Sequence, residues 1–237
     1  MNKKLNNKFI VIEGPDGSGK ATQTKLIIDY LKKEKYKVKK IDFPQYGKKS
    51  AGLVEEYLNG NYGKAEEIGP YRASVFYACD RYDASFKIKK WLEEGFVVVS
   101  DRYVSSNVAH QGGKIKDKKE RKDYIKWLYN LEYKIFEIPK PDITVILKTS
   151  TTFSYELSSK ITNKEKKAKK HLYLGDKKRD IHEEDKKHLE DSLNVYLEMA
   201  KEYPDEFIIV ECLDEEGKLL SREEIHNKVK KVLGNYD

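Results

Sequence analysis

The apolar run Phe9-Ile-Val-Ile-Glu13 leads without a break into Gly14-Pro-Asp-Gly-Ser-Gly-Lys20. The second part matches the G-x-x-x-x-G-K pattern of a phosphate-binding loop between a strand and a helix. Its glycines allow consecutive backbone N–H groups to point at phosphate oxygens, and the following helix N-terminus adds partial positive charge. We therefore predict a buried strand, a nucleotide-binding loop and a helix from about Ser18 to Lys33.

The loop favours ATP as its ligand, because the chain has no N-K-x-D guanine signature. Lys20 is expected to contact the β and γ phosphates. The predicted ATP-binding residues are Gly14, Gly17, Ser18, Gly19, Lys20, Ala21 and Thr22. Ala21 stands where a Ser or Thr usually gives its hydroxyl to Mg²⁺, so Thr22, water or carboxylates must replace it. The alternatives are a glycine-rich turn with a solvent-exposed lysine, or a loop that no longer binds nucleotide.

Further apolar runs alternate with helical patterns along the chain. The runs lie at residues 37–43, 96–100, 143–147 and 207–210. The helical faces comprise Val75, Cys79, Tyr82 and Phe86, then Tyr124, Trp127, Leu128, Leu131 and Ile135, then Leu189, Leu193, Tyr196, Leu197 and Ala200. Gly69-Pro70 is a good helix start. Strands that alternate with helices predict an α/β fold, a mainly parallel sheet with helices on both faces.

Charge is concentrated in one segment. The chain has 47 Lys and Arg against 40 Asp and Glu, a net charge of +7. Nine cations and two acids lie between Lys160 and Arg179, so the remaining chain is close to neutral. A duplex-binding domain usually spreads its positive charge over a face built from several elements, so we expect no nucleic-acid partner. We interpret residues 158–181 as a basic insertion within one domain that spans residues 1–237.

The composition excludes several protein classes. No stretch approaches the roughly 18 consecutive apolar residues of a membrane helix, and no apolar run follows the basic start, so we expect no membrane partner and a cytoplasmic protein. Cys79 and Cys212 form no metal or disulfide pattern, and we expect buried, reduced thiols. Redox chemistry therefore has little support.

Asp101-Arg102-Tyr103 follows the third apolar run. An aspartate at the carboxyl end of a central strand faces the crevice where such sheets bind ligands, and it can orient a metal or its water. Arg102 can donate two parallel hydrogen bonds to a phosphate. By itself the triplet is also compatible with a structural ion pair.

Six stretches carry a family resemblance in this order: GPDGSGKATQ, FPQYG, FYACDRYDA, DRYVSSNVAHQG, PDITVIL and RDIHEED. From about Phe9 to Leu213 the chain resembles the thymidylate kinase family, whose members phosphorylate dTMP with ATP in dTTP biosynthesis. The resemblance implies the P-loop NTPase three-layer fold, a five-stranded parallel sheet, a lid over ATP, Mg²⁺ as cofactor and a homodimer packed through helices.

The resemblance also implies residue roles. Lys20, Arg102, Asp16 and Arg179 would be catalytic, and Asp16, Asp101 and Glu183 would lie near Mg²⁺, with Asp180 beside them. Arg102 and Tyr46 would reach the dTMP phosphate, Tyr77 would stack on thymine, Arg81 would donate to thymine O4, Asn107 would face the base edge and His110 the sugar. The implied dTMP-binding residues are Asp16, Phe43, Tyr46, Tyr77, Arg81, Arg102, Ser106, Asn107, His110 and Gln111. A surface stack between Tyr77 and Arg81 is the alternative interpretation of that pair, which has helical i, i+4 spacing.

The sequence departs from the family at further positions besides Ala21. Gly17 replaces a loop arginine found in one branch, so a lid cation must neutralise the transition state, and Arg179 is the one lid arginine. Asp42 and Gln45 stand where relatives often have an arginine for the acceptor phosphate, which leaves more of that task to Arg102. His110 replaces an aromatic residue that disfavours ribose.

The chemistry requires no strong base, because the second pKa of a phosphate monoester is about 6. Catalysis then depends on alignment and charge neutralisation. The basic segment would exclude water as a lid, unless it is a disordered lysine-rich loop. The alternative functions are another deoxynucleoside or nucleoside monophosphate kinase, or a non-catalytic nucleotide-binding protein.

Overall fold

We describe a computed structural model of the chain for residues 4–159 and 186–234. The predicted lid from residue 160 onward, with Arg179, lies outside these ranges, and so do the acidic residues Asp180 and Glu183. Among the described residues, no helix has the length and apolar character needed to span a membrane.

Five strands form one parallel sheet in the order β2-β3-β1-β4-β5. They are β1 (Phe9–Glu13), β2 (Val38–Asp42), β3 (Val97–Asp101), β4 (Ile143–Lys148) and β5 (Phe207–Glu211). Each strand agrees with a predicted apolar run to within one residue at either end. The parallel five-stranded sheet and the α/β class are therefore confirmed.

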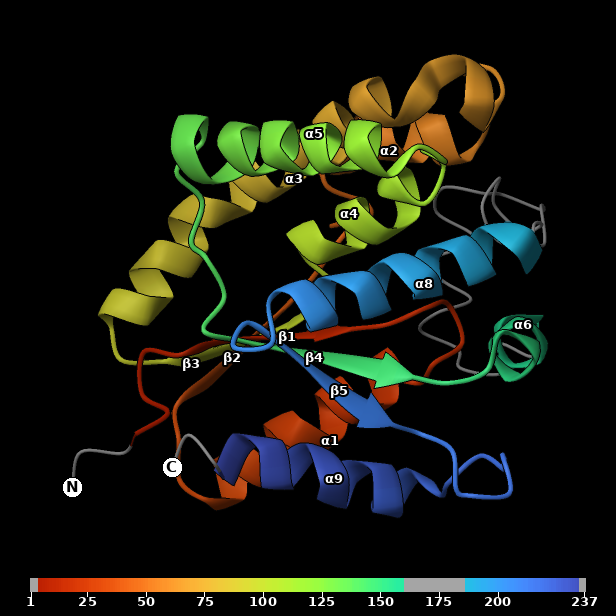
Figure 1. Cartoon of the computed structure of the whole chain (residues 1–237). Coiled ribbons are helices and arrows are strands. Elements are labelled where there is room, and N and C mark those ends of the chain that lie inside the picture. Colours follow the sequence, from red (N-terminus) through yellow and green to blue (C-terminus); the bar gives the residue numbers. More distant parts are fainter. Residues whose placement is uncertain (1–3, 160–185, 235–237) are drawn as a thin grey trace.

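Helices cover both faces of the sheet, and Figure 1 shows α1 and α9 on one face and α3, α4, α5 and α8 on the other. The α-helices are α1 (Lys20–Lys33), α2 (Gly52–Leu58), α3 (Ala65–Glu93), α4 (Val104–Gly112), α5 (Lys118–Tyr129), α6 (Thr151–Ser159), α8 (Lys186–Glu202) and α9 (Arg222–Gly234). A 3₁₀ turn, η1 (Lys49–Ala51), precedes α2, and a π-helix, η2 (Asn130–Ile135), follows α5.

Alternation along β1 builds two cores. Phe9 and Val11 belong to the cluster beneath α3, α4, α5 and α8, whereas Ile10 and Ile12 pack with α1 and α9. Successive side chains of a strand point to opposite faces, and both faces here are covered, so the whole strand is apolar up to Glu13. The core of the domain thus places the end of β1, and the loop after it, at the centre of one sheet edge.

Backbone conformation at two glycines sets where helices begin, once differently from the sequence prediction and once in agreement with it. Helix α1 begins at Lys20 instead of Ser18, because Gly19 has a left-handed backbone with φ of 91°. Helix α3 is interrupted at Gly69 (φ 73°, ψ 165°), so Pro70 begins its long second part as predicted. Both Cys79 and Cys212 are free, with Cys212 buried and Cys79 partly buried.

Candidate active site

The phosphate-loop motif lies between β1 and α1, as predicted. Gly14, Gly17 and Gly19 have positive φ values of 138°, 84° and 91°, which side chains disfavour. No side chain caps the N-terminus of α1 among the described residues, so backbone N–H groups there remain for an anion. The local geometry therefore has the features of a phosphate cradle.

Gly17 also allows a close approach of another segment. A Cβ built at Gly17 would lie 2.1 Å from the backbone oxygen of Ser154 in α6. An arginine at this position, as in one branch of the resembling family, would therefore collide with α6. This contact gives a structural reason for the glycine.

The Lys20 side chain folds back over the loop. Its Nζ donates to the backbone oxygens of Gly14 and Pro15, each at 2.8 Å, and the residue is buried. A solvent-exposed lysine, the alternative interpretation of the motif, is thereby excluded. The ammonium group instead lies against the loop that would hold the phosphates.

Arg102 and Asp16 meet at the same edge of the sheet. Strands β1 and β3 are neighbours, with Ile12 opposite Asp101, so the residues after each strand lie side by side. The Arg102 Nη2 group forms an ion pair with Asp16 Oδ1. Arg102 itself has a left-handed backbone, with φ of 71°, which aims its side chain toward the loop.

Arg102 makes two further contacts through Nη1, to Ser106 Oγ at 3.2 Å and to His110 Nε2 at 3.0 Å. Burial alone would lower the pKa of this guanidinium, but nearby carboxylates, first Asp16, outweigh it and raise the pKa. Arg102 therefore keeps its charge, as an anion-binding residue must.

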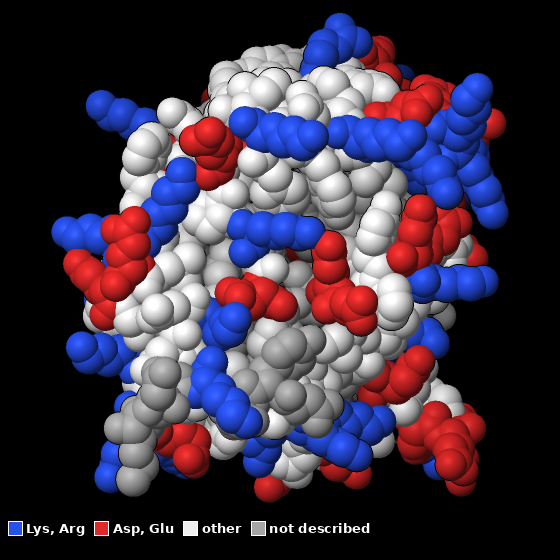
Figure 2. All heavy atoms as spheres, turned by 60° about the vertical axis from the view of Figure 1, so that its left-hand side comes forward, with Lys and Arg blue, Asp and Glu red and all other residues white. Residues whose placement is uncertain are grey.

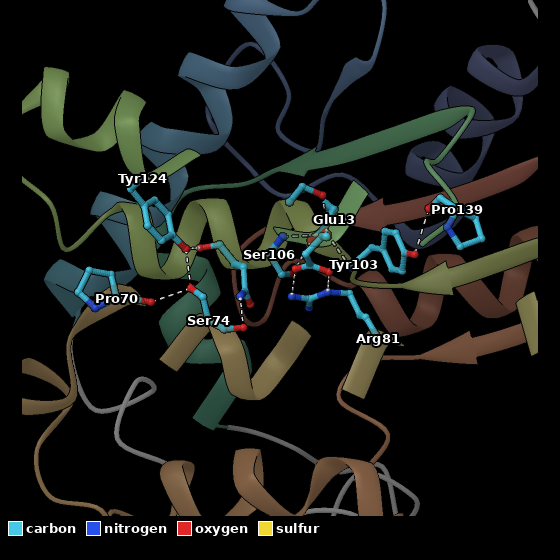
Figure 3. A network of polar contacts seen from close by, with 11 residues as sticks. Glu13, Pro70, Ser74, Arg81, Tyr103, Ser106, Tyr124 and Pro139 are labelled. Atoms are coloured by element: carbon cyan, nitrogen blue, oxygen red, sulfur yellow. Dashed lines mark hydrogen bonds and ion pairs between the residues drawn. The ribbon is translucent and has the colours of Figure 1, made fainter. Parts of the chain in front are cut away.

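Glu13 is a buried carboxylate that organises the start of α4, and Figure 3 shows it between Tyr103 and Ser106. It accepts hydrogen bonds from the backbone of Tyr103 (2.8 Å) and Ser106 (3.1 Å) and from the hydroxyls of Ser105 (2.8 Å), Ser106 (2.7 Å) and Tyr196 (2.8 Å). A carboxylate at a helix N-terminus is stabilised by the helix dipole and the unpaired N–H groups. Glu13 thus holds the segment that carries Arg102 against the phosphate loop.

The remaining predicted acceptor residues come from α3, α4 and the loop after β2. Phe43 is buried in the core, whereas Tyr46 and Tyr77 pack at the edge of a smaller apolar cluster that includes Tyr57. Asn107 Nδ2 donates to the backbone oxygen of Ser74 at 3.3 Å. Asn107 on α4 thus contacts α3, while Tyr46 from the loop after β2 and Tyr77 on α3 share one cluster.

Gln111 and Gln45 each have a charged neighbour. Gln111 Oε1 accepts from Lys114 Nζ at 2.8 Å, and burial lowers the pKa of Lys114 to about 8. Gln45 donates through its backbone to Asp80 Oδ2 at 2.8 Å, which ties the loop after β2 to α3. Gln45 thus has a structural partner at a position where members of the family that the sequence resembles often have an arginine.

Arg81 is engaged in an ion pair that the sequence did not predict. Its Nε and Nη2 donate to the two oxygens of Glu132 on η2, at 2.8 and 2.6 Å. Tyr77 is partly buried and Arg81 is buried, so the pair is not a surface stack. The ion pair uses two of the three guanidinium nitrogens, and a contact from Nη1 to a base stays a prediction.

Residues that sequence reasoning missed are mostly buried acids and their partners: Glu13, Glu132, His188, Ser192 and Tyr196. A carboxylate directly after an apolar strand is a visible signal for Glu13. The spacing of four between His188, Ser192 and Tyr196 is a further signal, since it places them on one helix face.

Known proteins with similar sequences and structures share one description. The sequence model described as "Thymidylate kinase" matches residues 12–223. A thymidylate kinase of Plasmodium falciparum is 30% identical over 155 residues, 65% of this chain and 68% of the relative. One from Mesoplasma florum is 28% identical over 226 residues, 95% of this chain and 94% of the relative.

Solved structures support the fold. The thymidylate kinase structure from Candida albicans gives a TM-score of 0.69 at 22% identity and covers 98% of this chain and 94% of its own. The thymidylate kinase structure from Ehrlichia chaffeensis gives a TM-score of 0.62 at 24% identity, and the match covers 95% of this chain and 98% of that structure's chain. The three-layer arrangement around a parallel five-stranded sheet is thus the fold of both structures.

Proposed function

The chain belongs to the thymidylate kinase family and phosphorylates dTMP with ATP, and from this premise we propose how its own residues carry out the transfer. The proposal rests on one observation. The phosphate loop with Lys20 and the Arg102–Asp16 pair lie at the carboxyl ends of the neighbouring strands β1 and β3. Ligands of open parallel sheets bind at this edge.

Two anions must meet for the transfer to occur. We assign the ATP phosphates to the loop amides and Lys20, and the dTMP phosphate to Arg102. Asp16 lies between the two sites and keeps Arg102 in place until the acceptor phosphate arrives. Because the acceptor oxygen is already largely anionic at neutral pH, positioning and charge neutralisation supply the catalysis.

The acceptor pocket is assigned to α3, α4 and the loop after β2. Tyr77 would stack on thymine, and Asn107 and Arg81 would contact its edge. His110 and Ser106, both within reach of Arg102, would lie near the sugar and the phosphate. Phe43, Tyr46 and Gln111 would complete the wall of the pocket.

The residues fit a magnesium ion held mainly by phosphates. The described part of the chain contains no cluster of three His, Cys, Asp or Glu side chains able to hold a metal. Mg²⁺ usually keeps several waters and binds through one or two carboxylates plus substrate phosphates. Ser18 Oγ in the loop is buried and unpaired in the described structure, which offers one hydroxyl nearby in place of the missing side chain at Ala21. Asp16 and Asp101 would orient the ion's water, and the ion would neutralise charge on the transferred group.

Residues outside the described ranges complete the proposal. Arg179 would act from the basic segment at about 158–181 as a cation for the transition state, and Glu183, which follows that segment, would act as a carboxylate near the ion. Within this single domain, the segment would close over ATP and exclude water. Both substrates are multiply charged and cross a bilayer poorly, which favours action in the cytoplasm.

The test is an ADP-release assay with dTMP, dUMP, dCMP and thymidine as acceptors. We expect the fastest turnover with dTMP and a loss of at least about 100-fold in kcat/KM for dTMP in Arg102→Ala. Arg121→Ala, which changes an arginine on α5 that pairs with Glu198, is the control. Fastest turnover on thymidine would overturn the assignment of a monophosphate acceptor.

We also propose a homodimer formed through α3 and η2. The helical face of Val75, Cys79, Tyr82 and Phe86 points outward, and the exposed fraction is 61% for Phe86 and 63% for Ile135 on η2. Tyr82 contacts the rings of both Phe86 and Phe136, at centroid distances of 5.2 and 4.9 Å. A contiguous exposed apolar patch of this kind favours a protein partner.

The charge pattern does not oppose association. In Figure 2, Lys, Arg and carboxylate side chains are interspersed on the face shown, with uncharged areas between them. Sedimentation of the wild-type protein should give a dimer and Phe86→Glu a monomer. Leu219→Glu, at an exposed leucine in the loop after β5, should stay dimeric. A monomeric wild-type protein at micromolar concentration would overturn the proposal.

A further inference from the structure

We infer that His188 on α8 is a positioning residue for Arg102: it holds His110 in the tautomer that accepts a hydrogen bond from the arginine. The inference rests on the proposed function for one point, the assignment of Arg102 to the dTMP phosphate. It adds a residue pair, His188 and Ser192, from outside the acceptor pocket defined above.

The first step follows from the donor inventory of arginine. A guanidinium has N–H donors and no acceptor, so His110 Nε2, which lies 3.0 Å from Arg102 Nη1, must accept. A neutral imidazole accepts at one nitrogen and donates at the other. The proton of His110 must therefore be on Nδ1.

The second step identifies what receives that proton. His110 Nδ1 lies 3.1 Å from His188 Nε2 and 3.4 Å from Ser192 Oγ. Ser192 Oγ donates its own hydrogen to the backbone oxygen of His188 at 2.7 Å, so its oxygen faces His110 as an acceptor. His188 Nε2 is the nearer acceptor. The hydrogen bonds therefore run in one direction, from Arg102 to His110 and from His110 to His188.

The surroundings of His110 favour the neutral imidazole that this series of hydrogen bonds requires. His110, His188 and Ser192 are all buried. Burial lowers the pKa of His110 well below its usual value, and Arg102, His188 and Lys20 lower it further, while Asp16 acts in the opposite direction. On the α8 side, the Tyr196 ring approaches the imidazole edge-on, and its hydroxyl donates to Glu13.

Helix geometry explains why α8 supplies these partners. His188, Ser192 and Tyr196 have spacings of four and share one face, and Ser106 and His110 do the same on α4. The Ser106 hydroxyl accepts from Arg102 and donates to Glu13, so the two α4 side chains contact the guanidinium together. The α8 face thus supports both α4 contacts to Arg102, through His188 and through Tyr196.

The inference has a direct test in the wild-type protein. Long-range ¹H–¹⁵N NMR spectra distinguish the two neutral histidine tautomers by their nitrogen shifts. We expect the Nδ1–H form for His110 at neutral pH. An Nε2–H form would overturn the inference whatever the behaviour of any variant.

Kinetics of two variants give the second test. In His188→Gln the amide oxygen takes the place of Nε2 as acceptor, whereas His188→Leu has no polar atom there. We expect His188→Leu to raise KM for dTMP by about tenfold and His188→Gln by less than about threefold, with KM for ATP little changed in both. Equal effects of the two variants, or an unchanged KM for dTMP in His188→Leu, would overturn the inference.

The failure of this inference and that of the proposed function are distinguishable. If Arg102→Ala leaves dTMP turnover intact, the assignment of Arg102 to the acceptor phosphate is wrong. If Arg102→Ala abolishes turnover but His188→Leu behaves as the wild type, only the positioning role of His188 is wrong.

Discussion

Arg81 and Glu132, 51 positions apart in the sequence, form a two-point ion pair inside the protein. The exposed fraction of the side chain is 2% for Arg81 and 0% for Glu132. Glu132 lies on η2, the π-helical continuation of α5, so this pair fastens the end of α5 to the middle of α3. Short π-helical segments often occur at functional sites.

Loss of Glu132 should destabilise the fold strongly. Glu132→Ala leaves the Arg81 charge buried without its partner, which typically costs about 3–5 kcal/mol in the free energy of unfolding. Urea denaturation would measure this change. The matched control is Glu198→Ala, which breaks the pair with Arg121 where Glu198 is 46% exposed; we expect a loss of at most about 1 kcal/mol. Similar losses in the two variants would show that the buried ion pair contributes no more to stability than the exposed one.

The strands and the phosphate loop could be predicted from sequence because their signals are local. The strand is apolar from Phe9 to Ile12, which indicates a strand covered on both faces, and the glycines after it predict the positive φ values. The meeting of Asp16 with Arg102 is different, since it depends on β1 lying next to β3 and on the left-handed backbone of Arg102.

Buried acids were missed because their partners are distant in sequence. Within its helix Glu132 has no local feature that distinguishes it from a surface carboxylate, and only the packing of η2 against α3 reveals Arg81 as its partner. The α3 face of Val75, Tyr82 and Phe86 shows a related limit. Periodicity predicts a helix there but does not say whether that face meets the core or the solvent.

Lys20→Ala should remove activity at a small cost in stability. The substitution removes two hydrogen bonds from Nζ to loop carbonyls, each worth about 0.5–1.5 kcal/mol, so the melting temperature should fall by roughly 2–12 °C while the protein stays folded. Turnover of dTMP should fall by at least about 100-fold, because no other described cation contacts the loop in this way.

Two measurements check this prediction, the ADP-release assay and thermal unfolding followed by circular dichroism. Lys25→Ala, at an exposed lysine of the same helix, is the control and should change neither. If Lys20→Ala were unfolded at room temperature, the lysine would be chiefly a structural residue.

Substitutions at two loop glycines distinguish the energetic cost of a steric collision from that of backbone strain. Gly17→Ala and Gly19→Ala both place a side chain on a residue with positive φ, which costs about 1–2 kcal/mol. At Gly17 the Cβ also meets Ser154 O at 2.1 Å, whereas nothing lies within 4 Å of a Cβ at Gly19. Gly17→Ala should therefore lower the free energy of unfolding by a further ~1–3 kcal/mol. Urea denaturation of both variants measures the difference, and equal stability would mean that α6 moves away without cost.

Acid should weaken the fold through His110. Burial lowers the pKa of His110 well below 6.5 in the folded protein, and the charges of Arg102 and then His188 lower it further. In the unfolded chain the same residue takes up a proton near pH 6.5, so below that pH the unfolded state binds more protons than the folded state. The contribution of His110 to the free energy of unfolding is therefore fully present above about pH 6.5. It decreases as the pH falls, by up to about 1.4 kcal/mol per pH unit.

The measurement compares wild type with His110→Gln, whose side-chain oxygen can still accept from Arg102 but does not titrate. Urea denaturation at pH 7.5, 6.5 and 5.5 should show the wild type losing more stability than the variant below about pH 6.5. Contributions from groups that do not interact with His110, including His226, whose pKa burial also lowers, cancel in this comparison. A constant difference between the two proteins across this pH range would show that His110 accepts its proton at the same pH in both states, which its buried contact with Arg102 does not allow.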